Sequence, residues 1–384
     1  CEQRCIHSGS GAIQPKPNSV SSQIFTEPRY PRRVALYDRI ESLPLVVDSI
    51  ALDPLQRDVS SAFTRRSTVV RLRGGGEEGI GEDVTYNVED HEALDAAGPD
   101  PALEGEHTVE SFSRLVASLD LFPEEPRMAA SRHYRRWAFE SAALDLALRQ
   151  AGRSLADVLE RESRPVRFVI SMRLPDPPSS ERVRRWLELY PAAEFKLDPT
   201  SDWTDDLAAE LAATGAVRAV DLKGMYKGTV VDAPPDPQLY ERVARAFPDA
   251  LIEDPAVNDE TRPVLEPHVA RISWDEPIHS WADVESRPWP PGALNVKPSR
   301  FGSVRALFDT YERAAERGLP LYGGGQFELG PGRGQIQLLA SLFHPDGPND
   351  VAPADYNAPE AREGLPASPL ELNPAATGFR LAGD

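Results

Sequence analysis

The stretch ALIEDPAVNDETRPVLEPHVARISWDEP, residues 250–277, contains two short apolar segments that each end in carboxylates. The segments at 250–255 and 271–277 have the length of buried strands, and the 22 residues from Glu253 to Asp275 leave room for one helix. A strand, a crossover helix and a second strand form the unit from which parallel sheets are built. The stretch therefore predicts an α/β fold whose strands end at one common edge.

The same alternation of apolar strands and amphipathic helices extends from Arg164 towards the C-terminus. Eight such units close into a (β/α)8 TIM-type barrel, which we predict for residues 164–355. Helices are predicted at 180–190, 204–215, 237–247, 303–318 and 332–343. Strands are predicted at VRFVIS (166–171), EFKLD (194–198), VRAVDLK (217–223), ALIEDP (250–255), RISWDEP (271–277), ALNVKPS (293–299) and LPLYGGGQF (319–327), with NDVAP (349–353) as a weak eighth.

The residues outside the barrel show other patterns. Residues 46–163 begin with apolar runs broken by glycine, which predict two or three antiparallel strands, and continue with helical segments at 107–119 and 133–152. This order predicts an α+β domain. Residues 1–45 are rich in Ser, Pro, Arg and Gln and are predicted to be a disordered leader, with structure starting near Leu45. We expect the C-terminal segment, 356–384, to return to the α+β domain.

Two glycine-rich stretches look like nucleotide-binding motifs. GGGEEG, residues 74–79, fits the dinucleotide fingerprint, but carboxylates surround the supposed phosphate site and a strand follows instead of a helix. We interpret it as a hairpin turn. The later GGGQFELGPGRG, residues 323–334, lacks the Gly-Lys-Ser/Thr ending of a phosphate loop. Neither stretch predicts a nucleotide cofactor.

The charge of the chain limits its partners. The 384 residues include 42 Lys and Arg against 61 Asp and Glu, which gives a formal charge of −19. This charge repels nucleic-acid phosphates and anionic lipids, and no apolar run is long enough to span a membrane. We expect no nucleic-acid or membrane partner, and a cytoplasmic location, because the N-terminal residues lack the apolar core of a signal peptide. Barrels with an added domain commonly form homo-oligomers, so association of this chain with copies of itself is compatible with the sequence.

Three carboxylates end successive predicted strands. Asp221 ends the third strand, Glu253 the fourth and Asp275 the fifth. In a parallel barrel these ends converge at the C-terminal mouth, where such barrels place their active sites. Three hard oxygen ligands suit Mg²⁺ better than Zn²⁺, which prefers His or Cys. The alternative is that each is a surface carboxylate of an acidic chain, but three successive strand ends favour a magnesium site.

Two lysines flank this predicted metal site. Lys196 lies on the second strand and Lys297 ends the sixth. A desolvated lysine beside a cation can lose enough basicity to act as a general base. A metal that holds a substrate carboxylate, with an amine over the adjacent carbon, is suited to remove the α proton and to stabilise the resulting enediolate.

Taken in order, these motifs resemble the enolase superfamily, in particular its muconate-lactonizing and o-succinylbenzoate-synthase-like branch. The resemblance covers about residues 46–384. It implies an α+β capping domain on a modified (β/α)8 barrel, Mg²⁺ bound by Asp221, Glu253 and Asp275, and Lys297 as an acid/base or cation-stabilising group. The motifs that carry it are VVRLRGGGEEGIGED (69–83), AFESAALDLALRQAGRSLADVL (138–159), FKLD (195–198), VDLKG (220–224), LIEDP (251–255), SWDEP (273–277), NVKPSRFGS (295–303) and the late glycine loop.

The chain departs from this branch at two positions. The branch usually has Lys-x-Lys on the second strand, with the second lysine as the base, and here Lys196 is followed by Asp198. The third strand usually reads Asp-x-Asn, and here Lys223 takes the place of the asparagine. Lys223 shares one side of its strand with Asp221, so it either pairs with that carboxylate or serves as a relocated base. Asp198 is either an unusual base or a partner of Lys196.

Two hypotheses of different classes follow. The first is a Mg-dependent lyase or isomerase that abstracts a proton α to the carboxylate of a small molecule through an enediolate intermediate, as a cycloisomerase or dehydratase does. Racemisation needs an acid and a base on opposite faces, so the loss of one lysine favours a one-base reaction. The second is a barrel that has lost this chemistry and serves as a metabolite-binding or assembly protein, its mouth neutralised by salt bridges.

Overall fold

The fold is known from a computed structural model, which describes residues 34–60, 63–229, 231–358 and 360–384. Residues 1–33 of the predicted leader lie outside the described residues. Ala35–Asp384 pack as one unit. No helix among the described residues is long and apolar enough to cross a membrane.

The ordered fold begins earlier than the predicted start at Leu45. Leu36, Tyr37 and Ile40 are buried around the 3-10 turn η1 (Tyr37–Arg39). The hydroxyl of Tyr37 donates a hydrogen bond to Glu110 over 3.0 Å, and the backbone N–H of Leu36 donates to Glu312 over 2.9 Å. The prediction was wrong here because a short apolar segment after a long polar stretch carries too little periodicity to be recognised.

The capping domain is built on antiparallel strands. Three of them form a sheet in the order β2-β3-β4, and β1 pairs with β5 in a separate ladder. Gly74 and Glu77 are paired across the β3–β4 turn, where Gly75 and Gly76 have positive φ, so the hairpin interpretation of GGGEEG is confirmed. The strands are β1 (Pro44–Val47), β2 (Ser49–Ser60), β3 (Phe63–Gly74), β4 (Glu77–Asp83) and β5 (Gly105–Thr108).

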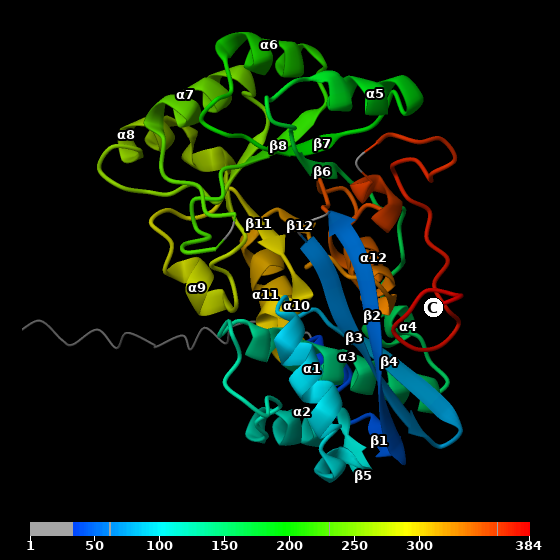
Figure 1. The fold of residues 1–384 in the computed structure, drawn as a ribbon. Coiled ribbons are helices and arrows are strands. Elements are labelled where there is room, and N and C mark those ends of the chain that lie inside the picture. Colours follow the sequence, from blue (N-terminus) through cyan, green and yellow to red (C-terminus); the bar gives the residue numbers. More distant parts are fainter. Residues whose placement is uncertain (1–33, 61–62, 230, 359) are drawn as a thin grey trace, which may run out of the picture. The chain divides into compact units, whose positions relative to one another are not determined.

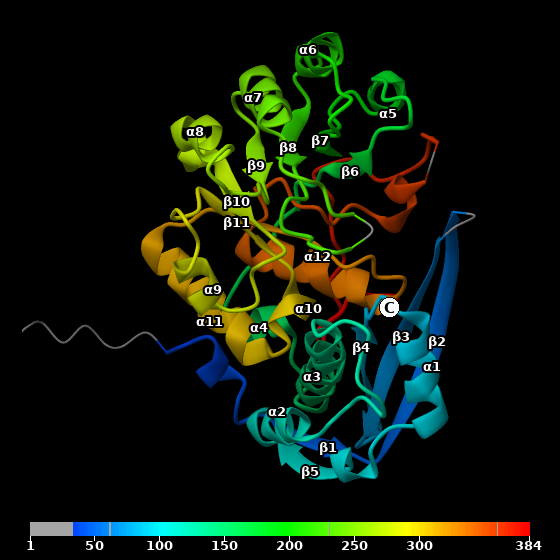
Figure 2. The ribbon, with the colours of Figure 1, turned by 60° about the vertical axis from the view of Figure 1, so that its left-hand side comes forward.

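The long helix α3 (Ser131–Gln150) joins this sheet to the rest of the molecule (Figure 2). It packs against β4 on one side and against the short helix α10 (Pro298–Phe301) on the other. A side chain at Gly79 or Gly81 would begin about 2 Å from the α3 backbone, which is why β4 carries glycine at both positions. The other helices of the cap are α1 (Val88–Ala97), η2 (Pro101–Leu103) and α2 (Val109–Ser118).

The second part of the chain forms a parallel barrel sheet in the order β12-β11-β10-β9-β8-β7-β6 (Figure 1). Asn349 and Asp350 fill the gap between the two edge strands, because they form parallel bridges with Phe168 and Gly324. The predicted weak eighth strand is thus present in a minimal form. The strands are β6 (Ile170–Arg173), β7 (Phe195–Asp198), β8 (Val217–Asp221), β9 (Leu251–Glu253), β10 (Ile272–Trp274), β11 (Ala293–Val296) and β12 (Leu321–Gly323).

The helices around the barrel lie close to their predicted ranges. The crossovers flanking β10 contain only short helices. The predicted fold class, a (β/α) barrel with an α+β cap, is confirmed. The helices are α4 (Leu155–Leu159), α5 (Glu181–Leu189), α6 (Asp205–Ala213), α7 (Pro237–Ala246), α8 (Arg262–Leu265), η3 (Glu266–Arg271), α9 (Trp281–Glu285), α11 (Val304–Arg317), α12 (Pro331–Phe343) and η4 (Ala354–Asn357).

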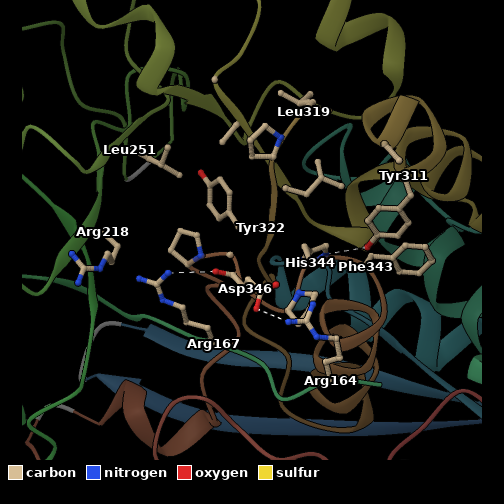
Figure 3. Close-up of a pocket in the computed structure, with 18 of the residues that line it drawn as sticks. Arg164, Arg167, Arg218, Leu251, Tyr311, Leu319, Tyr322, Phe343, His344 and Asp346 are labelled. Atoms are coloured by element: carbon tan, nitrogen blue, oxygen red, sulfur yellow. Dashed lines mark hydrogen bonds and ion pairs between the residues drawn. The ribbon is translucent and has the colours of Figure 1, made fainter. Parts of the chain in front are cut away.

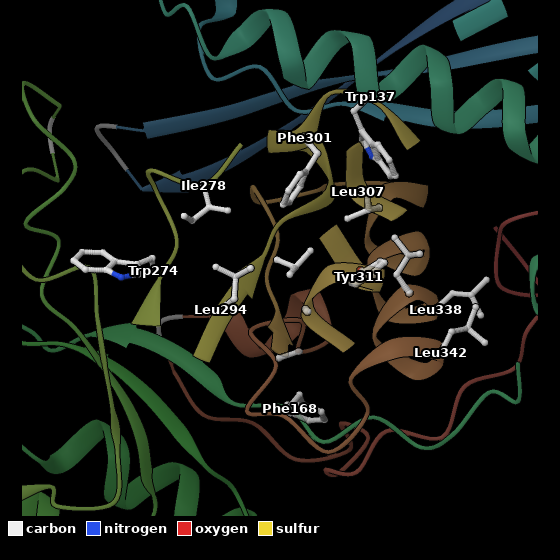
Figure 4. Close-up of a cluster of buried hydrophobic side chains, with 14 of the residues drawn as sticks. Trp137, Phe168, Trp274, Ile278, Leu294, Phe301, Leu307, Tyr311, Leu338 and Leu342 are labelled. Atoms are coloured by element: carbon white, nitrogen blue, oxygen red, sulfur yellow. The ribbon is translucent and has the colours of Figure 1, made fainter. Parts of the chain in front are cut away.

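Cap and barrel share one hydrophobic core (Figure 4). Trp137 of α3 points towards the buried side chains Phe301 of α10 and Leu307 of α11. Each fully buried large apolar side chain contributes about 1.5–3 kcal/mol to folding. The C-terminal segment also contacts the cap, since Arg380 forms an ion pair with Asp145 of α3. The barrel mouth is therefore held firmly beneath the capping domain.

Candidate metal centre at the barrel mouth

Three buried carboxylates meet at the C-terminal ends of adjacent strands. Asp221 and Glu253 are direct partners in the β8–β9 ladder, and Asp275 follows β10. One oxygen of each lies within 4.8 Å of the others, and all three side chains are fully buried. The structure thus brings together the three residues predicted from successive strand ends. They are called the carboxylate triad below.

Lys196 inserts its ammonium group between two members of the triad. Its Nζ lies 3.0 Å from Asp221 Oδ2, 2.5 Å from Glu253 Oε1 and 3.6 Å from Asp350 Oδ2. Burial alone would lower the pKa of Lys196, but Asp221 and Glu253 outweigh burial and raise it well above its ordinary value. The two neighbouring carboxylates thus favour the charged form of Lys196. The lowered pKa expected for a lysine beside a bound cation stays a prediction.

Lys223 turns back over the end of its own strand. Its backbone has a φ of 53°, in the left-handed region, and its Nζ lies 2.6 Å from Asp221 Oδ2 and 3.7 Å from Asp198 Oδ1. Against the effect of burial, these two carboxylates raise the pKa of Lys223. Of the alternatives left by the sequence, the structure realises the pair of Lys223 with Asp221, and it gives Asp198 an ion pair with Lys223.

Asp198 is a carboxylate without full hydrogen bonding. Its Oδ1 is buried and makes no hydrogen bond among the described residues. Burial raises the pKa of Asp198, although Lys223 opposes the shift. Lys297, which follows β11, lies on the other side of the triad with its Nζ 2.9 Å from Asp275 Oδ2.

Two residues that the sequence interpretation missed approach Asp275. The hydroxyl of Tyr226 donates to Asp275 Oδ2 over 2.9 Å, and Arg300 Nη2 donates to Tyr226 over 3.2 Å. Arg300 Nη1 lies 3.4 Å from Asp275 Oδ1. The position of Arg300, three residues after Lys297 and one helical turn away, was a usable signal. Tyr226 lies on a long loop, where no periodicity indicates a direction.

The missed residues around Glu253 hold the triad in place. Tyr322 donates to Glu253 Oε2 over 2.6 Å, and Asn295 donates to Oε1 over 3.2 Å. The next residue, Asp254, accepts the backbone N–H groups of Asp275 and Glu276, each over 2.8 Å. These contacts fix the ends of β9 and β10 relative to each other.

The charge balance of the centre fits a divalent cation. Among the described residues, four cationic side chains, Lys196, Lys223, Lys297 and Arg300, face six carboxyl groups, Asp198, Asp221, Glu253, Asp254, Asp275 and Asp350, and four minus six gives a formal charge of −2 when all ten are ionised. Burial raises the pKa of Asp254 well above its ordinary value, which makes the centre less negative than this formal count. Burial, then the Asp221 and Asp275 charges, raise the pKa of Glu253 to about 7, although Lys196 opposes them. Asp275 Oδ1 is buried without a hydrogen-bond donor. Hard oxygen donors with unbalanced negative charge are the ligands that Mg²⁺ prefers.

The capping domain closes over this mouth. Arg65 of β3 is fully buried and donates hydrogen bonds to the carbonyls of Gln326 (3.0 Å) and Phe327 (3.2 Å) in the loop after β12. Tyr86 donates to the side chain of Gln326 over 2.9 Å. Arg65 thus ties the cap to the barrel.

Solved structures with a similar fold include several enzymes. Muconate lactonizing enzyme from Pseudomonas putida aligns with a TM-score of 0.57 at 21% identity over 80% of this chain and 88% of its own. Muconate cycloisomerase from Pseudomonas fluorescens aligns with a TM-score of 0.58 at 20% identity, over 80% of this chain and 87% of its own. Dipeptide epimerase from Methylococcus capsulatus, complexed with Mg ion, aligns with a TM-score of 0.57 at 19% identity, over 88% of this chain and 92% of its own. At 19–21% identity these likenesses show the fold, which is the capped barrel that the motifs indicated.

The chain belongs to the DUF8230 family, described as a domain of unknown function. The N-terminal domain of this family matches residues 38–158 and the C-terminal domain matches residues 162–358. Curated relatives include an N-succinylamino acid racemase from Thermus thermophilus, 27% identical over 85% of this chain and 91% of the relative. A second N-succinylamino acid racemase, from Amycolatopsis sp, is 28% identical over 79% of this chain and 82% of the relative.

Proposed function

We propose that the protein is a Mg-dependent isomerase or lyase that removes a proton α to the carboxylate of a small molecule, through an enediolate intermediate. The observation that carries this proposal is the fully buried carboxylate triad at the ends of adjacent strands. The names of the relatives, racemases, cycloisomerases and epimerases, support a reaction of this type.

The residues of this chain have the following roles in the proposal. Asp221, Glu253 and Asp275 hold the metal, which when bound supplies the positive charge that stabilises the enediolate. Lys297, whose Nζ lies 2.9 Å from Asp275 Oδ2, exchanges the proton with the substrate carbon. Lys196 is held protonated by Asp221 and Glu253 and stabilises negative charge from the opposite flank.

Lys223 and Asp198 take the positions at which the branch places an asparagine and its second lysine. Their ion pair of 3.7 Å leaves no neutral amine on that side of the mouth. Lys297 therefore remains as the one proton-transfer group of the proposal. A single such group favours a cycloisomerase- or dehydratase-like reaction over racemisation.

Solvent deuterium exchange tests the proposed function. The protein is incubated with Mg²⁺ in D₂O with a panel of carboxylic acids that includes N-succinylamino acids and muconate-like diacids, and the α protons are followed by proton NMR. We expect loss of one α-proton signal with wild-type protein, and a reduction of at least about 100-fold in Lys297→Gln, since general acid/base groups contribute 10²–10⁴-fold.

The matched control is Lys227→Gln. Lys227 lies on the loop after β8 with an exposed side chain and pairs with Asp232 over 3.7 Å. Equal exchange in Lys297→Gln and in this control would overturn the role of Lys297, and no exchange with any substrate in the presence of Mg²⁺ would count against enolising chemistry.

A second candidate function rests on the position of Lys196. Its ammonium group contacts two triad members, and Lys223 contacts Asp221 as well, so cations already occupy much of the ligand surface. Such a mouth suits a metabolite-binding or assembly protein that keeps the barrel without its chemistry. Retention of a carboxylate ligand without any deuterium exchange is the outcome that favours this candidate.

A further inference from the structure

A cavity of about 830 Å³ lies at the end of the barrel opposite the triad (Figure 3). Leu251, Ala293 and Leu321, which line it, are the first residues of β9, β11 and β12, whereas the triad lies at the far ends of the strands. The inner wall includes Tyr322, whose hydroxyl reaches Glu253 from the cavity side. The cavity is thus separate from the proposed active site, and nothing in the proposed reaction uses it.

Arginines form one wall of the cavity. Arg161, Arg164, Arg167 and Arg218 line it, together with the carboxylates Asp249 and Asp346. Glu194 accepts hydrogen bonds from Nε and Nη2 of Arg167, over 2.5 and 2.6 Å, and from Nε of Arg218 over 2.6 Å. The wall thus gathers four guanidinium groups, in a chain whose formal charge is −19.

Two of these arginines retain capacity for a ligand. Among the described residues, the contact of Arg218 with Glu194 uses Nε alone, so the two terminal nitrogens of the guanidinium stay available. Arg164 pairs only through Nη2 with Asp346, whose side chain is 76% exposed and therefore weakly held. Guanidinium groups bind carboxylates and phosphates through paired N–H donors.

The facing wall is apolar. Leu319 and Pro320 line it, beside Tyr311, whose ring stacks on Phe343 with centroids 4.0 Å apart. His344 adds no charge at neutral pH, because burial lowers its pKa to about 4. A cavity of this size with an apolar wall and a few charged groups matches the sites that proteins use for small organic ligands.

We propose that this cavity binds a small organic anion, whose carboxylate or phosphate group meets Arg164 and Arg218 and whose apolar body packs against Leu319 and Pro320. The proposal is independent of the proposed function, since none of these residues belongs to the metal centre. Its test uses no catalytic measurement, so the two can fail separately.

Isothermal titration of the full chain with phenyl phosphate tests the proposal, with phenol as the uncharged analogue of the same ring and benzoate as the carboxylate analogue. We expect saturable binding of phenyl phosphate or benzoate and no detectable binding of phenol. The double variant Arg164→Gln/Arg218→Gln should weaken binding by at least about ten-fold, because hydrogen bonds to charged groups are lost.

Arg185→Gln is the matched control, since Arg185 lies on α5, is exposed and pairs only with Glu181 among the described residues. If the double variant does not fold, Arg164→Gln alone replaces it, because its one ion pair is on the surface. The proposal would be overturned if neither phenyl phosphate nor benzoate bound, if phenol bound equally well, or if Arg185→Gln weakened binding as much as the double variant.

Discussion

At the scale of single residues, the metal centre contains more carboxylates than cationic side chains to pair with them. Asp221 is the clearest case, because one of its oxygens contacts both Lys196 and Lys223. Burial would raise the pKa of Asp221, and the two lysines lower it well below its ordinary range. A metal and these ammonium groups therefore compete for the same oxygen.

Removing one competitor should strengthen metal binding. In Lys223→Asn the ammonium 2.6 Å from Asp221 Oδ2 is replaced by a neutral amide, and asparagine tolerates the left-handed backbone at this position. We expect the Kd for Mg²⁺ to fall by about ten-fold, equivalent to ~1.4 kcal/mol, as measured by isothermal titration. Lys227→Asn serves as the control, and an unchanged or weaker affinity in Lys223→Asn would contradict the competition.

A second residue-scale prediction concerns His344. It is buried, its Nδ1 lies 2.7 Å from Asn349 Oδ1, and burial lowers its pKa from 6.5 to about 4. Between these values the unfolded chain binds a proton that the folded chain resists, so stability falls as the pH falls from about 6.5 towards 4. At pH 5 this amounts to about 2 kcal/mol relative to neutral pH.

Urea denaturation of wild type and His344→Gln at pH 7.5 and pH 5 measures this effect. The variant is less stable at pH 7.5, and the gap should narrow at pH 5 because glutamine does not titrate. A gap that stays constant or widens would show that His344 does not cause the loss.

At the scale of elements, one carboxylate connects a capping strand to a barrel helix. Glu82 of β4 accepts the backbone N–H groups of Leu329 (2.6 Å), Gly330 and Gly332 (both 3.0 Å) at the start of α12, and the hydroxyl of Ser67 over 2.7 Å. The N–H groups that a helix leaves unpaired at its N-terminus are thus satisfied from another domain.

Glu82→Gln should therefore lower the free energy of unfolding by about 1–3 kcal/mol, because charge-assisted bonds to three N–H groups are lost. Chemical denaturation measures the change. Glu77→Gln is the control on the same strand, since its pair with Arg149 is partly exposed and should contribute less than about 1 kcal/mol. Equal effects of the two substitutions would argue against the helix contact.

At the scale of the whole described unit, cap and barrel behave as one body. Arg65 donates to Val84 and Thr85 within the cap and to Gln326 and Phe327 of the barrel, and Trp137 of the cap lies in the shared core. The cap closes the mouth through these contacts and excludes water from the triad, which strengthens the electrostatic interactions there.

Arg65→Met should destabilise the protein by about 2–4 kcal/mol, because the carbonyls of Val84, Thr85, Gln326 and Phe327 each lose a hydrogen bond from the guanidinium group. Arg66→Met is a direct control. Arg66 follows on the same strand but points to the other face, where it pairs with Asp95, and its loss should cost less than about 1 kcal/mol. Scanning calorimetry distinguishes the two variants, and similar melting temperatures would contradict the role of Arg65 as the connection.

The parts predicted from the sequence are those with a local signal. The barrel strands are short apolar segments, and the triad was recognised because each carboxylate follows such a segment directly. The roles of Arg65, Glu82 and Tyr226 were not predicted. Each depends on a contact with a residue 49 or more positions away in the sequence, namely Phe327, Leu329 and Asp275. The pairing of Lys223 depends on a left-handed backbone, which no periodicity reveals. Local patterns identify elements, whereas contacts between elements need the fold.

Titration of metal-free protein with Mg²⁺ measures whether the triad binds a divalent cation. We expect saturable binding of one ion in the wild type, at least about 100-fold weaker binding in Asp275→Asn, and unchanged binding in Asp206→Asn, an exposed carboxylate on α6. Absence of binding in the wild type, or equal affinity in Asp275→Asn and in the wild type, would show that the triad does not bind the ion.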